Sequence, residues 1–370
     1  MKRLVLSGIN LFEGGPLSIY HDFLNMLIED KYFEKYDITI FVHKKELFNE
    51  YIGKIKIIEL PRSRKNYLYR LYYEYFYFWN YSRTKDIDIW ISLHDITPNV
   101  KAKKRFVYCH NPAPFLKNIT WNIFKYSKTT YFMKFFYSFL YKINIKKNTY
   151  VIVQQNWIRE EFERRFNIKN ILISKPYTKG LVCHVNDIEK INKKYIFIYP
   201  VFPRVFKNFE VICEACKLLN TTVAKDKYKV IFTIDGSENN YSKMLLEKYK
   251  VIKNIEWIGL QSRKKLFELY KNADCMIFSS LLETWGLPIS EFKNTNKPIL
   301  LADLAYSYET IGTYTKVNFF PPTNPKDLSN LMLDMINNKK QYKGNIDNIY
   351  KDCYFGWSEI CKAIILGDEK

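Results

Sequence analysis

The sequence predicts an α/β protein made of two doubly wound domains, each with a parallel sheet between helices. Three observations support this prediction. The chain has 370 residues, which suits two domains of about 100–200 residues each. Strand-like apolar runs alternate with helix-like segments almost throughout. A polar stretch at 175–194 interrupts this alternation, which then starts again.

The first half of the chain opens on a strand-like run and alternates from there. Expected strands lie at 3–7, 38–42, 55–60, 87–92, 105–109, 150–153 and 171–174. Expected helices lie at 17–29, 67–81, 126–141 and 157–166. Short apolar runs of this kind are typical of strands buried on both faces of a parallel sheet.

The second half repeats the pattern. Expected strands lie at 195–199, 229–234, 255–258, 275–279 and 298–301. Expected helices lie at 209–219, 241–249, 264–271, 288–294 and 325–337, followed by an aromatic and apolar tail at 354–365. We therefore expect domains at 1–180 and 181–350. Ligands of such domains bind at the carboxyl ends of the strands.

Composition narrows the class of protein. No apolar run approaches the roughly 20 residues that span a bilayer, and we expect the first apolar run to be a strand and not a signal peptide. The seven cysteines are scattered and odd in number, which favours a reducing compartment over a disulfide framework. Cys213 and Cys216 fall in an expected helix without a second cysteine pair or histidines, so we expect core packing and no zinc.

The positive charge is concentrated in one part of the chain. The net charge is +20, and residues 61–150 hold 17 Lys/Arg against four acidic residues, together with 25 of the 64 aromatic residues. The segments 62–79 and 115–147 dominate. Basic and aromatic residues together favour an anionic membrane surface. The alternative is an aromatic core beneath a solvated lysine face. No nucleic-acid-binding motif is present, so nucleic acid is not expected as a partner.

The most informative motif is a pair of carboxylates, Glu283 and Glu291. They lie in a glycine-bearing run between an expected strand at 275–279 and an expected helix at 288–294. Gly286 and Pro288 are helix-start signals. Free N–H groups at a helix start suit a phosphate, and neighbouring carboxylates can accept hydrogen bonds from sugar hydroxyls. The run therefore indicates a nucleotide-sugar site.

Arg204 and Lys207 form a second candidate loop, between the expected strand at 195–199 and the expected helix at 209–219. A guanidinium and an ammonium near a helix start would bind a diphosphate. Considered alone, Arg204 and Lys207 could also be two ordinary basic residues on the surface at a helix start. Their position relative to the paired glutamates favours the binding role.

The first half contributes weaker candidates. Gly14 and Gly15 lie in the loop after the first strand, where glycine permits close approach to a ligand. His110 follows the strand at 105–109, where it could bind a sugar hydroxyl or cap its own loop. His94 and Asp95 follow the preceding strand and form a similar candidate.

These residues resemble a known family. The run from Glu283 to Glu291 is similar to the Glu-x7-Glu signature of glycosyl transferases group 1, a large family of retaining GT-B glycosyltransferases. Other parts of the chain match the family as well. They are the segments 266–280 and 297–303, the glycine loop after the first strand, the loop with Arg204 and Lys207, and Tyr308-Glu309. The resemblance implies two Rossmann-like domains that face each other across a cleft. It also implies a C-terminal helix at 351–370 that crosses back to the first domain.

The resemblance implies a role for each candidate. Glu291 is expected to bind the donor ribose and Glu283 the transferred sugar. Arg204 and Lys207 are expected to hold the diphosphate together with the turn formed by Thr284, Trp285, Gly286 and Leu287. Gly14 and Gly15 are expected against the donor, and His110 against the transferred sugar.

The resemblance also implies the reaction: retaining, metal-independent hexosyl transfer from a UDP- or GDP-linked sugar, with no cofactor. The expected acceptor is a lipid-linked saccharide of a surface polysaccharide such as O-antigen or capsule. The expected location is the cytoplasm, peripheral on the inner face of the cell membrane. The alternatives are a nucleotide-sugar-dependent phosphorylase or hydrolase of the same fold, and a non-catalytic basic protein that binds membranes.

Overall fold

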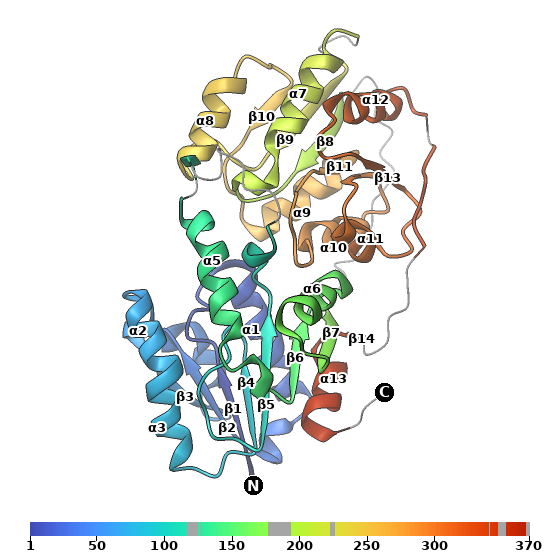
Figure 1. The fold of residues 1–370 in the computed structure, drawn as a ribbon. Helices are drawn as coiled ribbons and strands as arrows, with labels where there is room; N and C mark the ends of the chain where they lie inside the picture. Colours follow the sequence, from blue (N-terminus) through green and yellow to red (C-terminus); the bar gives the residue numbers. More distant parts are fainter. Residues whose placement is uncertain are drawn as a thin grey trace. The chain divides into compact units, whose positions relative to one another are not determined.

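A computed structural model describes residues 1–116, 125–126, 128–176, 194–222, 226–339, 341–346 and 353–367 (Figure 1). The chain divides into two compact units. Unit 1 is Met1–Pro114, Met133–Tyr177 and Ile349–Lys370, and unit 2 is Phe115–Phe132 and Thr178–Asn348. The segment 115–132, which we expected in the first domain, therefore groups with unit 2. Most of the polar stretch at 175–194 lies outside the described residues, as do positions 117–124 and 127 of the basic and aromatic segment 115–147.

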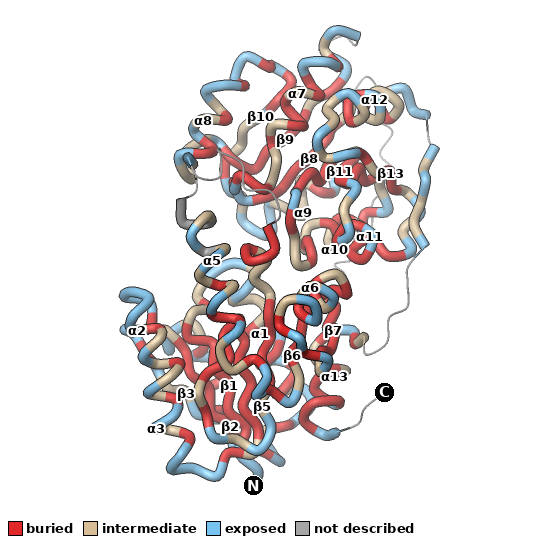
Figure 2. The backbone as a smooth tube through the Cα atoms, in the orientation of Figure 1, coloured by how far each residue is buried: buried red, intermediate tan, exposed pale blue. Residues whose placement is uncertain are grey.

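The described part of unit 1 contains an eight-stranded sheet with the order β14-β7-β6-β5-β4-β1-β2-β3, and its pairings are parallel. The strands are β1 Lys2–Ser7, β2 Tyr36–Val42, β3 Lys56–Glu59, β4 Ile89–Ser92, β5 Lys104–Cys109, β6 Tyr150–Val153, β7 Ile171–Lys175 and β14 Cys353–Phe355. The central strands are apolar and buried (Figure 2) because helices cover both faces of a parallel sheet.

Helices pack on both faces of this sheet. They are α1 Gly14–Glu29, α2 Tyr67–Tyr72, α3 Phe78–Arg83, α5 Lys128–Lys142, α6 Asn156–Phe166 and α13 Gly356–Cys361. One core lies between the sheet and helices α1 and α13, and Trp357 packs there at 4.7 Å from Phe23 and 5.0 Å from Tyr108 between ring centroids. The other contains Phe41, Phe78 and Trp90.

Unit 2 contains, in its described residues, a six-stranded sheet with the order β10-β9-β8-β11-β12-β13, also paired in parallel. The strands are β8 Tyr195–Tyr199, β9 Tyr228–Phe232, β10 Ile255–Trp257, β11 Cys275–Phe278, β12 Ile299–Ala302 and β13 Val317–Phe320. The helices are α7 Phe209–Leu219, α8 Asn240–Tyr249, α9 Arg263–Asn272, α10 Leu287–Lys293, α11 Ala305–Ile311 and α12 Pro325–Ile336.

The predicted α/β class is confirmed, with differences in individual elements. The predicted helix at 67–81 is a longer run in which a π-helical segment, Tyr73–Tyr77, joins α2 to α3. The first helix begins at Gly14 and not at residue 17. Helix α11 and strands β13 and β14 were not predicted because their sequence patterns are too short to show a period. Among the described residues, no helix combines the length and the apolar character needed to cross a membrane.

Each sheet reverses its strand order at one point, and ligands of open α/β sheets bind beside such a point, at the carboxyl ends of the strands. In unit 1 the reversal lies between β1 and β4, and in unit 2 it lies between β8 and β11. The segments that follow these four strands contain Gly14, at the start of α1, and Asp95, Lys207 and Glu283. The strand order therefore places these candidate binding residues where ligands of such sheets bind.

Candidate functional site

Strands β8 and β11 lie side by side in unit 2, with Phe197 opposite Cys275 and Ile198 opposite Met276. Because the two strands are parallel, the loops that follow them leave the same edge of the sheet. One loop leads to Lys207 and the other to Glu283. The Lys207 ammonium forms an ion pair with the Glu283 carboxylate, and the two side chains are only 14% and 12% exposed.

The backbone beneath Lys207 is held by several hydrogen bonds. Residues Val205–Lys207 form a single 3-10 turn, and Asn208 ends it in the left-handed region at φ 55°. The Tyr199 hydroxyl donates to the carbonyl oxygen of Lys207 at 2.5 Å, and the Ser279 hydroxyl donates to the same oxygen at 3.1 Å. The lysine is therefore positioned by the strands on both sides of the reversal.

The turn after Glu283 is also fixed. The Thr310 hydroxyl donates to the carbonyl of Trp285, and the Trp285 indole N–H donates to the Ser290 hydroxyl at 2.9 Å. Gly286 has φ 84°, and a Cβ there would lie 3.0 Å from the Ile289 Cδ1 atom, so glycine is required.

Helix α10 begins at Leu287 with no side chain capping its first turn. The amide groups at the start of a helix have no partner within the helix. Thr284 and Leu287 are half-buried on either side of the buried Trp285 and Gly286. The turn directly follows Glu283 in the sequence. It thus offers backbone N–H donors close along the chain to the carboxylate that pairs with Lys207.

Glu291 lies on α10 and has partners of its own. The Tyr270 hydroxyl donates to Glu291 Oε2 at 3.3 Å, and an Arg263 nitrogen lies 3.7 Å from Oε1. Burial raises the pKa of Glu291, while Arg263 and Tyr270 oppose that change. A carboxylate held in a largely buried position by a tyrosine is suited to accept hydrogen bonds from a pair of hydroxyls.

Arg204 differs from Lys207 in its surroundings. It is exposed, and its guanidinium carbon lies 5.8 Å from the centre of the Phe202 ring. Among the described residues its side chain forms no ion pair within 4.0 Å and no hydrogen bond, although the Glu283 carboxylate attracts it electrostatically. Arg204 is therefore available to a ligand but is not positioned in advance as Lys207 is.

In unit 1, Gly14 and Gly15 form the first residues of α1. Gly14 has φ 63°, and a Cβ there would meet no atom within 4 Å, so the residue borders open space. Gly8, earlier in the same loop, is required for packing, because a Cβ would lie 2.3 Å from the Tyr20 ring. The loop therefore uses one glycine for packing and another for conformation.

His110 follows β5 and is held through Asp95. The Asp95 Oδ1 atom accepts hydrogen bonds from the His110 amide at 2.7 Å, the Asn111 amide at 2.9 Å and the Tyr141 hydroxyl at 3.0 Å. Asp95 adopts φ 74° and is 5% exposed. The His110 Nδ1 atom is buried and has no hydrogen-bond partner among the described residues. Asp95 thus fixes the histidine's backbone, while the His110 Nδ1 atom lies 4.0 Å from the same Asp95 oxygen and the ring lies 5.6 Å from that of Tyr108.

His94, the other histidine singled out, has a different environment. It is fully buried and its Nε2 atom contacts the Glu74 carboxylate, which is also fully buried. Arg70 donates to the His94 carbonyl at 3.1 Å and to the Tyr137 hydroxyl at 2.7 Å. This network joins α2, the π-helical segment and α5 to the loop after β4. His94 is therefore part of the network that holds these elements together.

The structure brings together Lys207 and Glu283 in unit 2. In unit 1, Gly14 and Gly15 begin α1 after β1, and His110 follows β5, so all three lie beyond the carboxyl ends of strands. Sequence reasoning missed Arg263, Tyr270 and Thr310, whose local sequence gives no signal because only the tertiary fold makes them neighbours. Cys213 and Cys216 are buried in α7, as core packing predicts. In the described ranges, no three His, Cys, Asp or Glu side chains are grouped as metal ligands.

Part of the chain matches a known protein family and a curated relative. The model of the family "Glycosyl transferases group 1" matches residues 184–352. The O-antigen chain mannosyltransferase RfbU of Salmonella typhimurium is 21% identical over 214 residues, which is 56% of this chain and 59% of the relative. The chain therefore matches well under two thirds of the length of that curated relative.

Solved structures share the fold over almost the whole chain. Sucrose-phosphate synthase from Thermosynechococcus elongatus has a TM-score of 0.65 at 12% identity, covering 91% of this chain and 90% of that one. The lipopolysaccharide outer core galactosyltransferase WaaB has a TM-score of 0.61 at 13% identity, covering 93% and 92%. Anabaena HepE in complex with UDP and glucose has a TM-score of 0.59 at 11% identity, covering 92% and 91%. The chain therefore has the GT-B fold, and its residues 184–352 match the model of the glycosyl transferases group 1 family.

Proposed function

We propose that this protein is a retaining glycosyltransferase. It moves a hexose from a nucleotide diphosphate sugar, linked to UDP or GDP, to a lipid-linked saccharide during synthesis of a surface polysaccharide. The observation that carries the proposal is the Lys207–Glu283 pair at the strand reversal of unit 2. The match of residues 184–352 to the glycosyl transferases group 1 model supports it, as do the O-antigen and lipopolysaccharide enzymes among the similar proteins.

In the proposed donor site, Glu291 binds the ribose hydroxyls and Glu283 binds a hydroxyl of the transferred sugar. Lys207, Arg204 and the amides from Thr284 to Leu287 surround the diphosphate. Lys207 is preorganised by Tyr199 and Ser279, and such fixed positive charge stabilises a leaving group without reorganisation. UDP and glucose are bound in the HepE structure, which supports a nucleotide-sugar as donor.

In the proposed reaction, the acceptor hydroxyl oxygen bonds to the anomeric carbon on the face from which the nucleotide departs. The bond between that carbon and the diphosphate oxygen breaks, and its electron pair goes to the diphosphate. A diphosphate oxygen accepts the proton of the attacking hydroxyl, so the configuration is retained. Because Lys207, Arg204 and backbone amides supply the positive charge, the proposal includes no metal and no cofactor.

Unit 1 provides the acceptor side in this proposal. Gly14 and Gly15 approach the donor, and His110 donates a hydrogen bond to the transferred sugar. The basic and aromatic surface of unit 1 binds anionic lipid, which places the enzyme peripherally on the inner face of the cell membrane. Exposed aromatic side chains on α2, the π-helical segment and α5 support this role, among them Tyr72, Phe76, Phe135 and Phe139.

A thermal-shift screen of UDP- and GDP-linked hexoses tests the donor assignment. We expect one of them to stabilise the wild-type protein and to have no effect on the Glu291→Gln variant. Lys229→Gln is the control, because Lys229 lies at the amino end of β9, where it pairs with Glu256 at 3.0 Å. No stabilisation of the wild type by any nucleotide-sugar would refute the proposal.

A further inference from the structure

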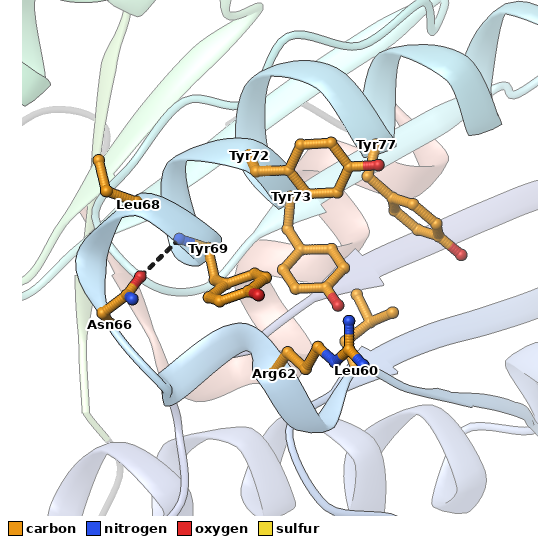
Figure 3. A pocket seen from close by; sticks show the side chains of 8 residues that line it. All are labelled: Leu60, Arg62, Asn66, Leu68, Tyr69, Tyr72, Tyr73 and Tyr77. Carbon is orange, nitrogen blue, oxygen red and sulfur yellow. Dashed lines mark hydrogen bonds between the residues drawn. The ribbon is translucent and has the colours of Figure 1, made fainter.

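A groove in unit 1 is lined by none of the residues proposed to bind the donor or the transferred sugar. It has a volume of about 740 Å³ and lies against α2 and the π-helical segment that follows it (Figure 3). Its lining includes Leu60, Arg62, Leu68, Tyr69, Tyr73 and Tyr77. Small-molecule sites commonly measure about 300–1,000 Å³ and combine apolar walls with a few polar groups. The groove has the size and the lining of a binding site.

The tyrosines form a continuous aromatic wall. The rings of Tyr73 and Tyr77 lie 5.4 Å apart at a steep angle, and Tyr72 lies 5.5 Å from Tyr73. Tyr77 also packs against Phe41 of the core, so the wall is anchored. The Asn66 side chain accepts a hydrogen bond from the Tyr69 amide at 3.0 Å and thereby fixes the start of α2 (Figure 3).

The π-helical segment explains why the rings of Tyr73 and Tyr77 both line the groove. A π turn shifts the positions of side chains along a helix and often marks a functional region. Here it places Glu74 in the buried network with His94 while Tyr73 and Tyr77 line the groove.

Arg62 gives the groove its charge. It is exposed, it lies on the turn Pro61–Arg64, and no described residue forms an ion pair or a side-chain hydrogen bond with it. The segment 60–73 has no acidic residue, and three of its four basic residues, Arg62, Arg64 and Lys65, are exposed, whereas the fourth, Arg70, is buried. The acidic residue that follows, Glu74, is fully buried. The groove is therefore complementary to a ligand with an anionic head and an apolar body.

Exposed apolar and aromatic side chains surround the groove and indicate the class of ligand. Leu68 is 76% exposed at the groove, and Phe76 and Trp79 are exposed further along the same helical run. On α5, Phe135 and Phe139 are exposed, while Phe136 packs against Tyr67 of α2 at 5.2 Å. Tyrosine and tryptophan beside basic residues are favoured at the headgroup level of a membrane. A groove open in such a surface can take a lipid directly from the bilayer.

We propose that the groove binds one lipid that carries a phosphate, with the phosphate on Arg62 and the hydrocarbon chain along Leu68 and the tyrosine rings. This inference rests on the membrane-side role proposed for unit 1 and makes it more specific. The general membrane surface holds the protein to the bilayer, whereas the groove selects a single molecule.

The test is titration calorimetry of the full-length protein with farnesyl phosphate as a soluble probe, together with thermal denaturation of each variant. We expect saturable binding by the wild type, at least tenfold weaker binding by Arg62→Gln and by Leu68→Ser, and weaker binding of farnesol than of farnesyl phosphate. Both variants replace exposed side chains, so their thermal stability should equal that of the wild type. Phe139→Ser is the matched control, with unchanged probe binding and reduced sedimentation with anionic vesicles.

Three results would overturn the proposal: no binding by the wild type, equal binding by Arg62→Gln, or displacement of the probe by inorganic phosphate or mannotriose. Displacement by phosphate would identify an anion site, and displacement by mannotriose a saccharide site. Nucleotide-sugar binding by unit 2 is measured separately and should be unchanged in Arg62→Gln. Loss of the lipid site and loss of the proposed glycosyl transfer can therefore be told apart.

Discussion

Replacing Asp95 by Asn tests the claim that this carboxylate holds the His110 loop. One Asp95 oxygen accepts three hydrogen bonds, at 2.7, 2.9 and 3.0 Å. Asn tolerates the left-handed conformation that Asp95 adopts at φ 74°, so the backbone cost does not change. The substitution keeps an acceptor oxygen and removes the charge.

The size of the effect follows from those three contacts. A hydrogen bond to a charged group contributes about 1.5–3 kcal/mol, against about 0.5–1.5 kcal/mol for a neutral one. A loss of about 1 kcal/mol for each bond predicts a decrease of about 3 kcal/mol in the free energy of unfolding. Urea denaturation followed by tryptophan fluorescence measures this quantity. Hydrogen exchange of the peptide that contains residues 109–112 should also become faster.

The control is Asp86→Asn. The Asp86 carboxylate is 77% exposed and pairs with Lys103 at 3.2 Å, and an exposed pair of this kind contributes about 0–1 kcal/mol. If Asp95→Asn changes the unfolding free energy by no more than this control does, the positioning role of Asp95 is wrong. If the proposed function holds, Asp95→Asn also lowers kcat, because the hydrogen bond that holds the His110 amide becomes weaker.

The remaining predictions concern glycines and one buried glutamate. Gly8→Ala should destabilise the protein by about 1–3 kcal/mol through overpacking against Tyr20; an unchanged urea midpoint would contradict this. Gly286→Ala should cost about 1–2 kcal/mol for its φ of 84°, and more than Gly53→Ala, whose φ is also positive but whose Cβ would meet no atom. Because burial raises the pKa of Glu291, the folded protein holds this proton more tightly than the unfolded chain does. The resulting stability is present at low pH and is lost as the pH rises through the folded pKa. Glu291→Gln should therefore raise the Tm of the unliganded protein at pH 7 but not at pH 4, and equal shifts at both pH values would contradict this.

The parts of the fold that the sequence predicts are those with strong periodicity. Strands such as β1 and helices such as α7 have apolar patterns long enough to identify their type. In contrast, β13 is four residues long with Asn318 in its middle, and α11 has seven residues. The π-helical segment could not be predicted because its extra residue per turn is stabilised by tertiary contacts such as Glu74 with His94.

The candidate site shows the same division. Lys207 and Glu283 each follow an apolar strand, and strand order brings their loops together. The partners of Glu291, and the Tyr141 partner of Asp95, could not be predicted in this way. Arg263 begins a helix 28 residues before Glu291, and Tyr141 lies on a helix after the His110 loop. Their contacts depend on how helices pack on the sheet, which local sequence does not determine.

The central claim is that unit 2 binds a nucleotide-sugar through Lys207 and Glu291. Titration calorimetry of the full-length protein with UDP- and GDP-linked hexoses tests it most directly, with Lys207→Met and Glu291→Gln as variants and Lys229→Gln as the control. We predict saturable binding by the wild type and the control, and at least tenfold weaker binding by each variant. Equal binding by all four proteins, or no binding by the wild type, would contradict the claim.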